Sequence, residues 1–128
     1  MTLQQVTPMI HVPDVRATAA WYESIGFAVL NTNEDGDDGM NFALLAYGNS
    51  QIMLNAGGRL SNEDRREVDL YVRTDEVDRL HERLKDLVQI RVGLNETFYG
   101  TREFIIKDPN GFWLTFGQDL DRHAKASN

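Results

Sequence analysis

The order of predicted elements repeats along this chain, and that repeat constrains the fold more than any other feature. Alternating apolar residues predict strands, whereas a three-four spacing of apolar residues predicts helices. The predicted order is strand, helix and three strands, then a polar linker and the same order again. When the sequence is aligned with itself at a shift of 62 residues, Val15 aligns with Val77, Phe42 with Phe104, Ile52 with Leu114 and Leu54 with Phe116. This match in order and apolar phase predicts two βαβββ modules.

Residues 5–56 are predicted to form module one. Asp14 is a suitable N-cap for a helix over 15–24, which Gly26 ends. Gly48-Asn49 is a hairpin signal between the last two strands. The strands are predicted at 6–12, 27–32, 42–47 and 51–55, with an acidic, turn-rich loop at 33–39.

Residues 67–118 are predicted to form module two, after a linker at 57–66. Thr74 or Asp75 can cap a helix whose apolar stripe runs from Val77 to Leu87. The strands are predicted at 68–72, 88–92, 104–107 and 112–116, with a turn at Asp108-Pro109-Asn110-Gly111. The polar residues 119–128 are expected to fray. We therefore predict one domain over residues 1–118 and a C-terminal tail.

Composition excludes several classes of protein. The net charge of −7 disfavours binding to a phosphate backbone, so we expect no nucleic-acid partner. The longest apolar run, Phe42–Tyr47, is too short to span a bilayer, so no membrane segment is expected. The chain has no cysteine and no visible secretory signal, which points to the cytoplasm.

Four stretches of the sequence resemble the vicinal-oxygen-chelate superfamily, which contains glyoxalases, bleomycin-resistance proteins and extradiol dioxygenases. Val12–Val15 (VPDV) followed by Ala20–Phe27 (AWYESIGF) resembles the opening of that family. Tyr99–Phe104 (YGTREF) and Asp108–Phe116 (DPNGFWLTF) resemble its closing hairpin. The resemblance implies an α+β fold in which two βαβββ modules form one curved mixed sheet around a cleft, commonly in a homodimer.

Metal-using members of that family take one ligand from each of three places. The resemblance places these positions on Thr7, on Glu67 or Asp69, and on Thr115. Threonine hydroxyls are poor ligands for divalent metals. The three histidines form no paired metal-binding motif. We therefore expect no metal and no cofactor.

Strand alternation predicts which side chains share the face of positions 7 and 115, the face that would line the cleft. Trp113 is the strongest candidate, because an aromatic side chain on that face needs a ligand or a dimer partner to cover it. The predicted ligand-binding residues are Met9, His11, Met53, Asn55, Glu67, Asp69, Glu103, Trp113 and Thr115.

Most of these candidates have a purely structural alternative. Met9 and Met53 could be core residues, and His11 at a strand end could simply bond exposed backbone. The two acids at 67 and 69 could face outward from a half-buried strand. Glu103 beside Arg102 could form an exposed edge pair.

These residues favour a metal-free, bleomycin-resistance-like protein that holds a flat or cationic small molecule and forms a homodimer. The missing ligands argue against catalysis without excluding it. One alternative is a metal-dependent lyase, isomerase or dioxygenase that uses His11, Glu67 or Asp69, and Glu103. Another is an interaction scaffold whose cleft is filled by side chains.

Overall fold

The computed structural model describes residues 2–35, 39–61 and 64–120. The chain divides into two compact units, Met1–Ser61 and Asn62–Asn128, and the boundary falls within the predicted linker. The first unit carries module one and the second carries module two. Each module contains its own four-stranded sheet and one helix. No helix in the described part of the chain is long and apolar enough to cross a membrane.

Module one forms a mixed sheet with the strand order β1-β4-β3-β2. The short strand β1 runs parallel to β4, whereas the other neighbouring pairs are antiparallel. The elements are β1 (Met9–His11), α1 (Val15–Ser24), β2 (Ala28–Glu34), β3 (Met40–Tyr47) and β4 (Ser50–Asn55).

Helix α1 occupies the residues that the sequence predicts. The carboxylate of Asp14 accepts a hydrogen bond of 2.9 Å from the backbone N–H of Ala17, as an N-cap does. Gly26, with φ of 117°, ends the helix in a conformation that glycine adopts without a steric penalty. Val15 and Tyr22 on the inner side of the helix are buried. The helix thus covers one face of the sheet.

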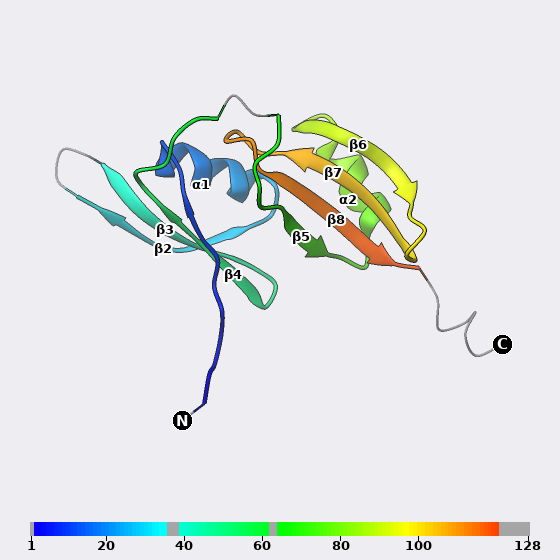
Figure 1. The fold of residues 1–128 in the computed structure, drawn as a ribbon, viewed down its shortest axis with the longest axis horizontal. Coiled ribbons are helices and arrows are strands. Elements are labelled where there is room, and N and C mark those ends of the chain that lie inside the picture. The colour runs from blue at the N-terminus through cyan, green and yellow to red at the C-terminus, as the bar shows by residue number, and fades with distance from the viewer. Residues whose placement is uncertain (1, 36–38, 62–63, 121–128) are drawn as a thin grey trace. The chain divides into compact units, whose positions relative to one another are not determined.

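Module two repeats this arrangement with the order β5-β8-β7-β6. Strand β5 is parallel to β8, and the remaining pairs are antiparallel. Figure 1 shows α2 behind β7 and β8. The elements are β5 (Leu70–Arg73), α2 (Val77–Leu84), β6 (Gln89–Glu96), β7 (Thr101–Lys107) and β8 (Trp113–Asp119). The two equal strand orders confirm the prediction of two βαβββ modules.

Helix α2 starts differently from the prediction. Glu76 is the N-cap residue, and its side chain makes no capping hydrogen bond. The Gln118 side chain accepts from the backbone N–H of Val77 at 3.0 Å, and the Thr74 hydroxyl accepts from that of Glu76 at 3.1 Å. Asp75 was therefore the wrong candidate, because a side chain from β8 takes the capping role. The helix also ends at Leu84, before Leu87.

The two parallel strand pairs share one register. Ile10 pairs with Leu54 in module one, and Val72 pairs with Phe116 in module two. Both members of the second pair lie 62 residues after those of the first. The predicted shift is therefore correct for these strands.

The antiparallel hairpins differ by one residue. Tyr47 pairs with Ser50 across a two-residue turn, whereas Lys107 pairs with Trp113 across the five residues 108–112. Phe104 pairs with Phe116, so its counterpart in module one is Ala43, the partner of Leu54. The predicted match of Phe42 with Phe104 is wrong by one position, because the longer turn shifts the register.

The longer turn of module two is built around Asp108. Its carboxylate accepts hydrogen bonds of 2.8 Å from the backbone N–H groups of Asn110 and Phe112. Gly111, with φ of 90°, supplies the positive dihedral angle. The turn returns the chain so that Phe116 stacks on Phe104 with ring centroids 5.1 Å apart. This pair lies at the centre of the module-two core.

Several strand limits differ from the predictions. Strand β1 is shorter than 6–12, while β6 and β7 are longer than predicted, and β5 begins at Leu70 instead of 68. Asn33 and Glu34 belong to β2, and residues 36–38 of the predicted acidic loop lie outside the described residues. Residues 118 and 119 belong to β8, and the rest of the predicted tail beyond 120 also lies outside the described part.

Candidate ligand-binding face

Each helix packs on one face of its own sheet, and the face away from that helix is called the open face. In module two the open face contains Tyr71, Glu103, Ile105, Lys107, Trp113 and Thr115. Strand register places them together, since Thr115 pairs with both Tyr71 and Ile105, and Trp113 pairs with Lys107. The predicted candidates Glu103, Trp113 and Thr115 therefore do lie on one face of one sheet.

Glu103 is the buried polar centre of this face. Only 4% of the residue is exposed. Its carboxylate accepts three hydrogen bonds, from the hydroxyls of Tyr71 (2.7 Å), Tyr99 (2.8 Å) and Thr101 (2.9 Å). Among the described residues no basic side chain pairs with it. The predicted alternative of an exposed edge pair with Arg102 is wrong, because Arg102 pairs with Asp78 instead.

The two tyrosines cover Glu103 while remaining accessible themselves. Tyr71 is 46% exposed and Tyr99 is 58% exposed. Loss of hydration and the hydrogen bond to Glu103 raise the pKa of Tyr71 to about 12. The hydrogen bond to Glu103 also raises the pKa of Tyr99. Both phenols therefore stay protonated and act as donors at neutral pH.

Gly117 makes room for the Tyr71 side chain. A Cβ atom at position 117 would lie 2.0 Å from the Tyr71 hydroxyl oxygen. Gly117 is opposite Glu103 in the register, so the phenol crosses β8 directly over this glycine to reach the carboxylate. The absence of a side chain here is therefore part of the Glu103 site.

Trp113 lies at the other end of the open face and is half-buried. The guanidinium carbons of Arg65 and Arg91 lie 4.3 Å and 5.3 Å from its ring centroid. Its indole N–H donates to the backbone carbonyl of Asp64 at 3.1 Å. Residues of its own chain therefore cover part of the indole, for which the sequence predicted a ligand or a dimer partner, and the rest of the side chain stays accessible.

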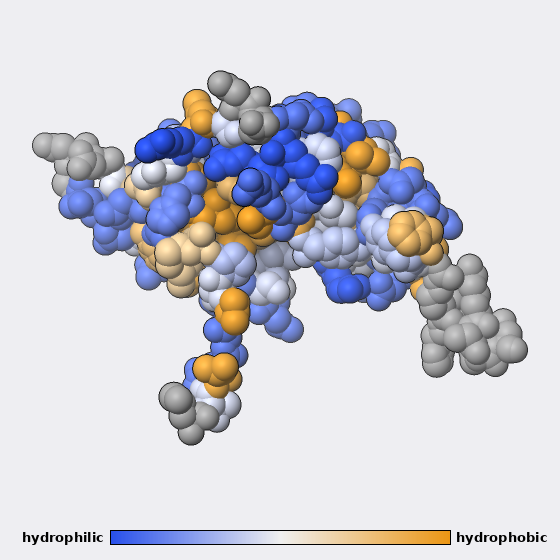
Figure 2. All heavy atoms as spheres, viewed as in Figure 1, coloured by the Kyte–Doolittle hydropathy of each residue, from blue (hydrophilic) through white to orange (hydrophobic). Residues whose placement is uncertain are grey.

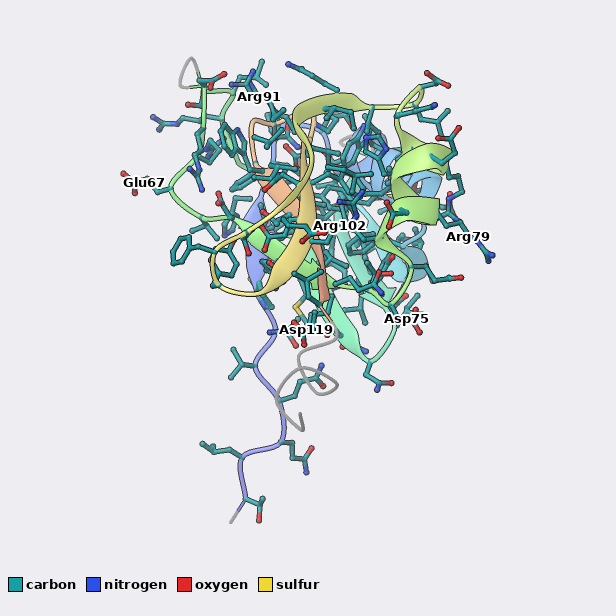
Figure 3. The ribbon with its side chains drawn as sticks, turned by 90° about the vertical axis from the view of Figure 1, so that its right-hand side faces the viewer. Glu67, Asp75, Arg79, Arg91, Arg102 and Asp119 are labelled. Carbon is teal, nitrogen blue, oxygen red and sulfur yellow. The ribbon has the colours of Figure 1, made fainter. Side chains whose placement is uncertain are left out.

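Glu67 and Asp69, the two acids before β5, differ in their surroundings. Glu67 is exposed, and Figure 3 shows it extending outward from the loop. Asp69 forms an ion pair with Arg65. Neither lies within a strand, since β5 begins at Leu70. The structure thus separates Glu67 from the open face, whereas Thr115 is buried within that face.

Four predicted residues belong to module one. Met9 is exposed, while Met53 and Asn55 are half-buried on β4. Met9 pairs with Met53 and His11 pairs with Asn55, so all four share the face opposite α1. The His11 imidazole lies 3.3 Å from the carbonyl oxygen of Ala56 through Nδ1, as the structural alternative for a strand-end histidine predicts.

The open face of module one is mainly apolar, in contrast to that of module two. Phe42 and Leu44 lie there with the two methionines, because they alternate with the buried Ala43 and Leu45. Phe42 pairs with Asn55, as Glu103 pairs with Gly117, so Phe42 is the structural counterpart of Glu103. Figure 2 shows hydrophobic atoms gathered over the strands of this module.

The residues at the family's metal positions do not fit a divalent metal. Thr7 and Thr115 offer neutral hydroxyls, and the Asp69 carboxylate is already paired with Arg65. In the alternative donor set, Glu67 extends into solvent and the Glu103 carboxylate is occupied by three hydroxyl donors. No group of three His, Asp or Glu residues suitable for a metal occurs within the described ranges.

Sequence reasoning missed several members of this face. Tyr71 could have been found by alternation from Asp69, which was a candidate. Thr101 alternates with Glu103 in the same way, and Tyr99 lies in the quoted closing motif. The contacts of Arg65 and Arg91 with Trp113 could not be predicted from a local sequence pattern. Arg65 reaches the indole from the loop before β5, and Arg91 reaches it from β6.

The fold and the sequence pattern together define the class of this protein. The model of the Glyoxalase/Bleomycin resistance protein/Dioxygenase superfamily matches residues 3–116, and the chain belongs to that family. No curated protein matches the sequence.

Several solved structures share the fold. TioX from Micromonospora sp. ML1 is 18% identical, with a TM-score of 0.74 over 91% of this chain and 99% of that chain. A bleomycin-binding protein solved with bleomycin is 20% identical, with a TM-score of 0.69 over the same shares, 91% and 99%. The fosfomycin resistance protein FosX from Listeria monocytogenes is 16% identical, with a TM-score of 0.72 over 95% and 98%.

Proposed function

We propose that this chain binds a flat, cationic small molecule at the open face of module two, without a metal. The observation that carries the proposal is the buried Glu103 carboxylate. Its three donors are all neutral hydroxyls, and its negative charge forms no ion pair within the described residues. Even with these hydrogen bonds, a buried charge without an ion pair is costly, and a cationic ligand nearby would offset part of that cost.

The aromatic residues around Glu103 support a flat ligand. The partly exposed rings of Tyr71 and Tyr99 lie between the carboxylate and solvent, so a planar cation could stack on a ring near the charge while the three hydroxyl donors stay in place. Phe98, at the turn between β6 and β7, contacts Tyr99 edge to face and is almost fully exposed. Figure 2 shows hydrophobic atoms protruding at this turn. The bleomycin-binding neighbour adds support for small-molecule binding within the family.

Thermal shift and calorimetry with proflavine, a planar aromatic cation, and with bleomycin test this proposal. We expect saturable binding that raises the melting temperature of the wild type. Glu103→Gln keeps the shape of the side chain and removes its charge, so it should weaken proflavine binding about tenfold or more. Glu96→Gln is the matched control, because Glu96 is an exposed acid on the neighbouring strand.

Equal affinities of the two variants would contradict the role of Glu103. Elemental analysis of protein purified without chelators checks the metal-free part of the proposal. Stoichiometric zinc, iron, manganese or nickel would contradict it.

A further inference from the structure

A second group of charges lies on the same open face, around Trp113. Arg65, Arg91 and Lys107 bring three positive charges to this end of the face, although the whole chain carries a net charge of −7. Two acids, Asp64 and Asp69, accompany them. The Trp113 end therefore has a positive balance, opposite in sign to the Glu103 end.

Asp64 binds this group much as a ligand anion would. One carboxylate oxygen accepts from Arg91 at 2.6 Å, and the other lies 3.6 Å from the Lys107 ammonium. Its backbone carbonyl accepts from the Trp113 indole. Figure 3 shows Arg91 beside the loop that carries Asp64. Carboxylates and phosphates present the same pair of acceptors to two cations.

The exposure of these groups favours the replacement of Asp64 by a ligand anion. The Asp64 side chain is 63% exposed, whereas those of Arg91 and Lys107 are 30% and 24% exposed. An exposed carboxylate on a loop loses little when water replaces its partners. The two cations are more desolvated, and any replacement must bring them another anion.

We propose that the Trp113 end is a subsite for the anionic group of a planar ligand, an aryl carboxylate or aryl phosphate, and that Asp64 holds the place of that anion in the free protein. The indole and the guanidinium planes of Arg65 and Arg91 provide surfaces on which the aromatic part can stack. Asp64 thus competes with the ligand.

The distance between Glu103 and Lys107 along β7 indicates how far apart two opposite charges on one ligand would lie. Lys107 lies four residues from Glu103 on the same strand, a separation of roughly 13 Å along an extended chain. A single dipolar ligand, with a cation and an anion at about this separation, would satisfy both ends of the face. The proposal of a dipolar ligand rests on the proposed cation site at Glu103. The anion subsite at Trp113 does not depend on that site.

Titration with 2-naphthoate and phenyl phosphate tests the subsite, with quenching of Trp113 fluorescence as the readout in a Trp21→Phe background. Asp64→Asn removes the competing charge and should tighten naphthoate binding about two- to fivefold, the scale of one exposed charge pair. Lys107→Met should weaken it by a similar factor. Asp119→Asn is the matched control, because Asp119 is an acid of similar exposure that pairs with Arg73 at 2.9 Å.

Equal effects of Asp64→Asn and Asp119→Asn would overturn the subsite, since net charge alone would then explain the change. Failure of Asp64→Asn protein to bind either probe at millimolar concentration would overturn it as well. A response to Asp64→Asn together with no proflavine binding would support the subsite and contradict the cation site. Glu103-dependent proflavine binding without an Asp64 effect would contradict the subsite alone.

Discussion

Tyr71 binds its phenolic proton more tightly in the folded protein than in the unfolded chain. Its pKa is about 12 in the fold, against 10.0 as the ordinary value. A group with a raised pKa stabilises the fold fully below the unfolded value, and that contribution is lost as the pH rises through the folded value. The Tyr71 contribution is therefore intact up to pH 10 and disappears between pH 10 and about 12.

Gly117→Ala should lower the pKa of Tyr71 toward the ordinary value. The new methyl group would push the hydroxyl off the Glu103 carboxylate and into water. Spectrophotometric titration at 295 nm measures tyrosinate, and the highest-pH component of the wild type should move down in the variant. The Tyr71→Phe variant lacks this phenol, so the titration component that it loses belongs to Tyr71. An unchanged titration curve of the Gly117→Ala protein would show that Tyr71 does not depend on the space at position 117.

The adjacent aromatic residues Trp21 and Tyr22 should differ in their contribution to stability. Tyr22 of α1 is fully buried, and its ring packs edge to face on that of Phe27 with centroids 5.1 Å apart. Trp21 of the same helix is half-buried. Tyr22→Ala should lower the free energy of unfolding by about 3–5 kcal/mol, as deletion of a buried aromatic does. Trp21→Ala should cost clearly less. Urea unfolding of both variants checks this order, and the reverse order would place Trp21 in the core.

At the scale of elements, the start of α2 depends on a residue far away in the sequence. Gln118→Ala removes the acceptor of the Val77 N–H, and it should cost about 0.5–2 kcal/mol, the usual value of a lost N-cap. Asp75→Ala is the control and should change stability little, because Asp75 makes no capping contact in the described structure. Chemical unfolding measures both free energies of unfolding. Equal losses in the two variants would contradict the capping role of Gln118 and favour Asp75, one of the two caps that the sequence predicts.

Local chemistry made much of the fold predictable from the sequence. The cap at Asp14, the turn at Gly48-Asn49 and the Asp108 turn each depend on residues within a few positions. The apolar phase of β4 and β8 then gave the correct shift of 62 residues. Phe42 was placed wrongly because turn length sets hairpin register, and turn length could not be read from the strand residues.

The candidate site was less predictable, because its contacts are long-range. Alternation placed Glu103 and Trp113 on one face, as the structure has them. The hydroxyl of Tyr71, 32 residues away, and the loop at Asp64, 49 residues from Trp113, come to that face only through the strand order. Alternation from Asp69 could have placed Tyr71 on this face, but no local pattern gives its contact with Glu103 or the contact of Asp64 with Trp113.

At the scale of the whole molecule, we expect two chains to associate. The open face of module one carries the exposed Met9 and the half-buried Phe42, Leu44 and Met53, and a group of accessible apolar side chains on one face is typical of an interaction surface. Light scattering at micromolar concentration should give twice the chain mass of 14.6 kDa. A single-chain mass under those conditions would contradict the expectation.

The unequal faces of the two modules have a consequence for how such a protein can evolve. Phe42 and Glu103 hold equivalent places in two copies of one architecture, yet one is apolar and the other charged. If the copies arose by duplication, the scaffold of strands and helices was inherited twice, and ligand chemistry had to change in only one of them. If module two binds a ligand as proposed, new recognition can be selected through single substitutions at positions such as 71, 103 and 113, while the other copy keeps its own packing intact.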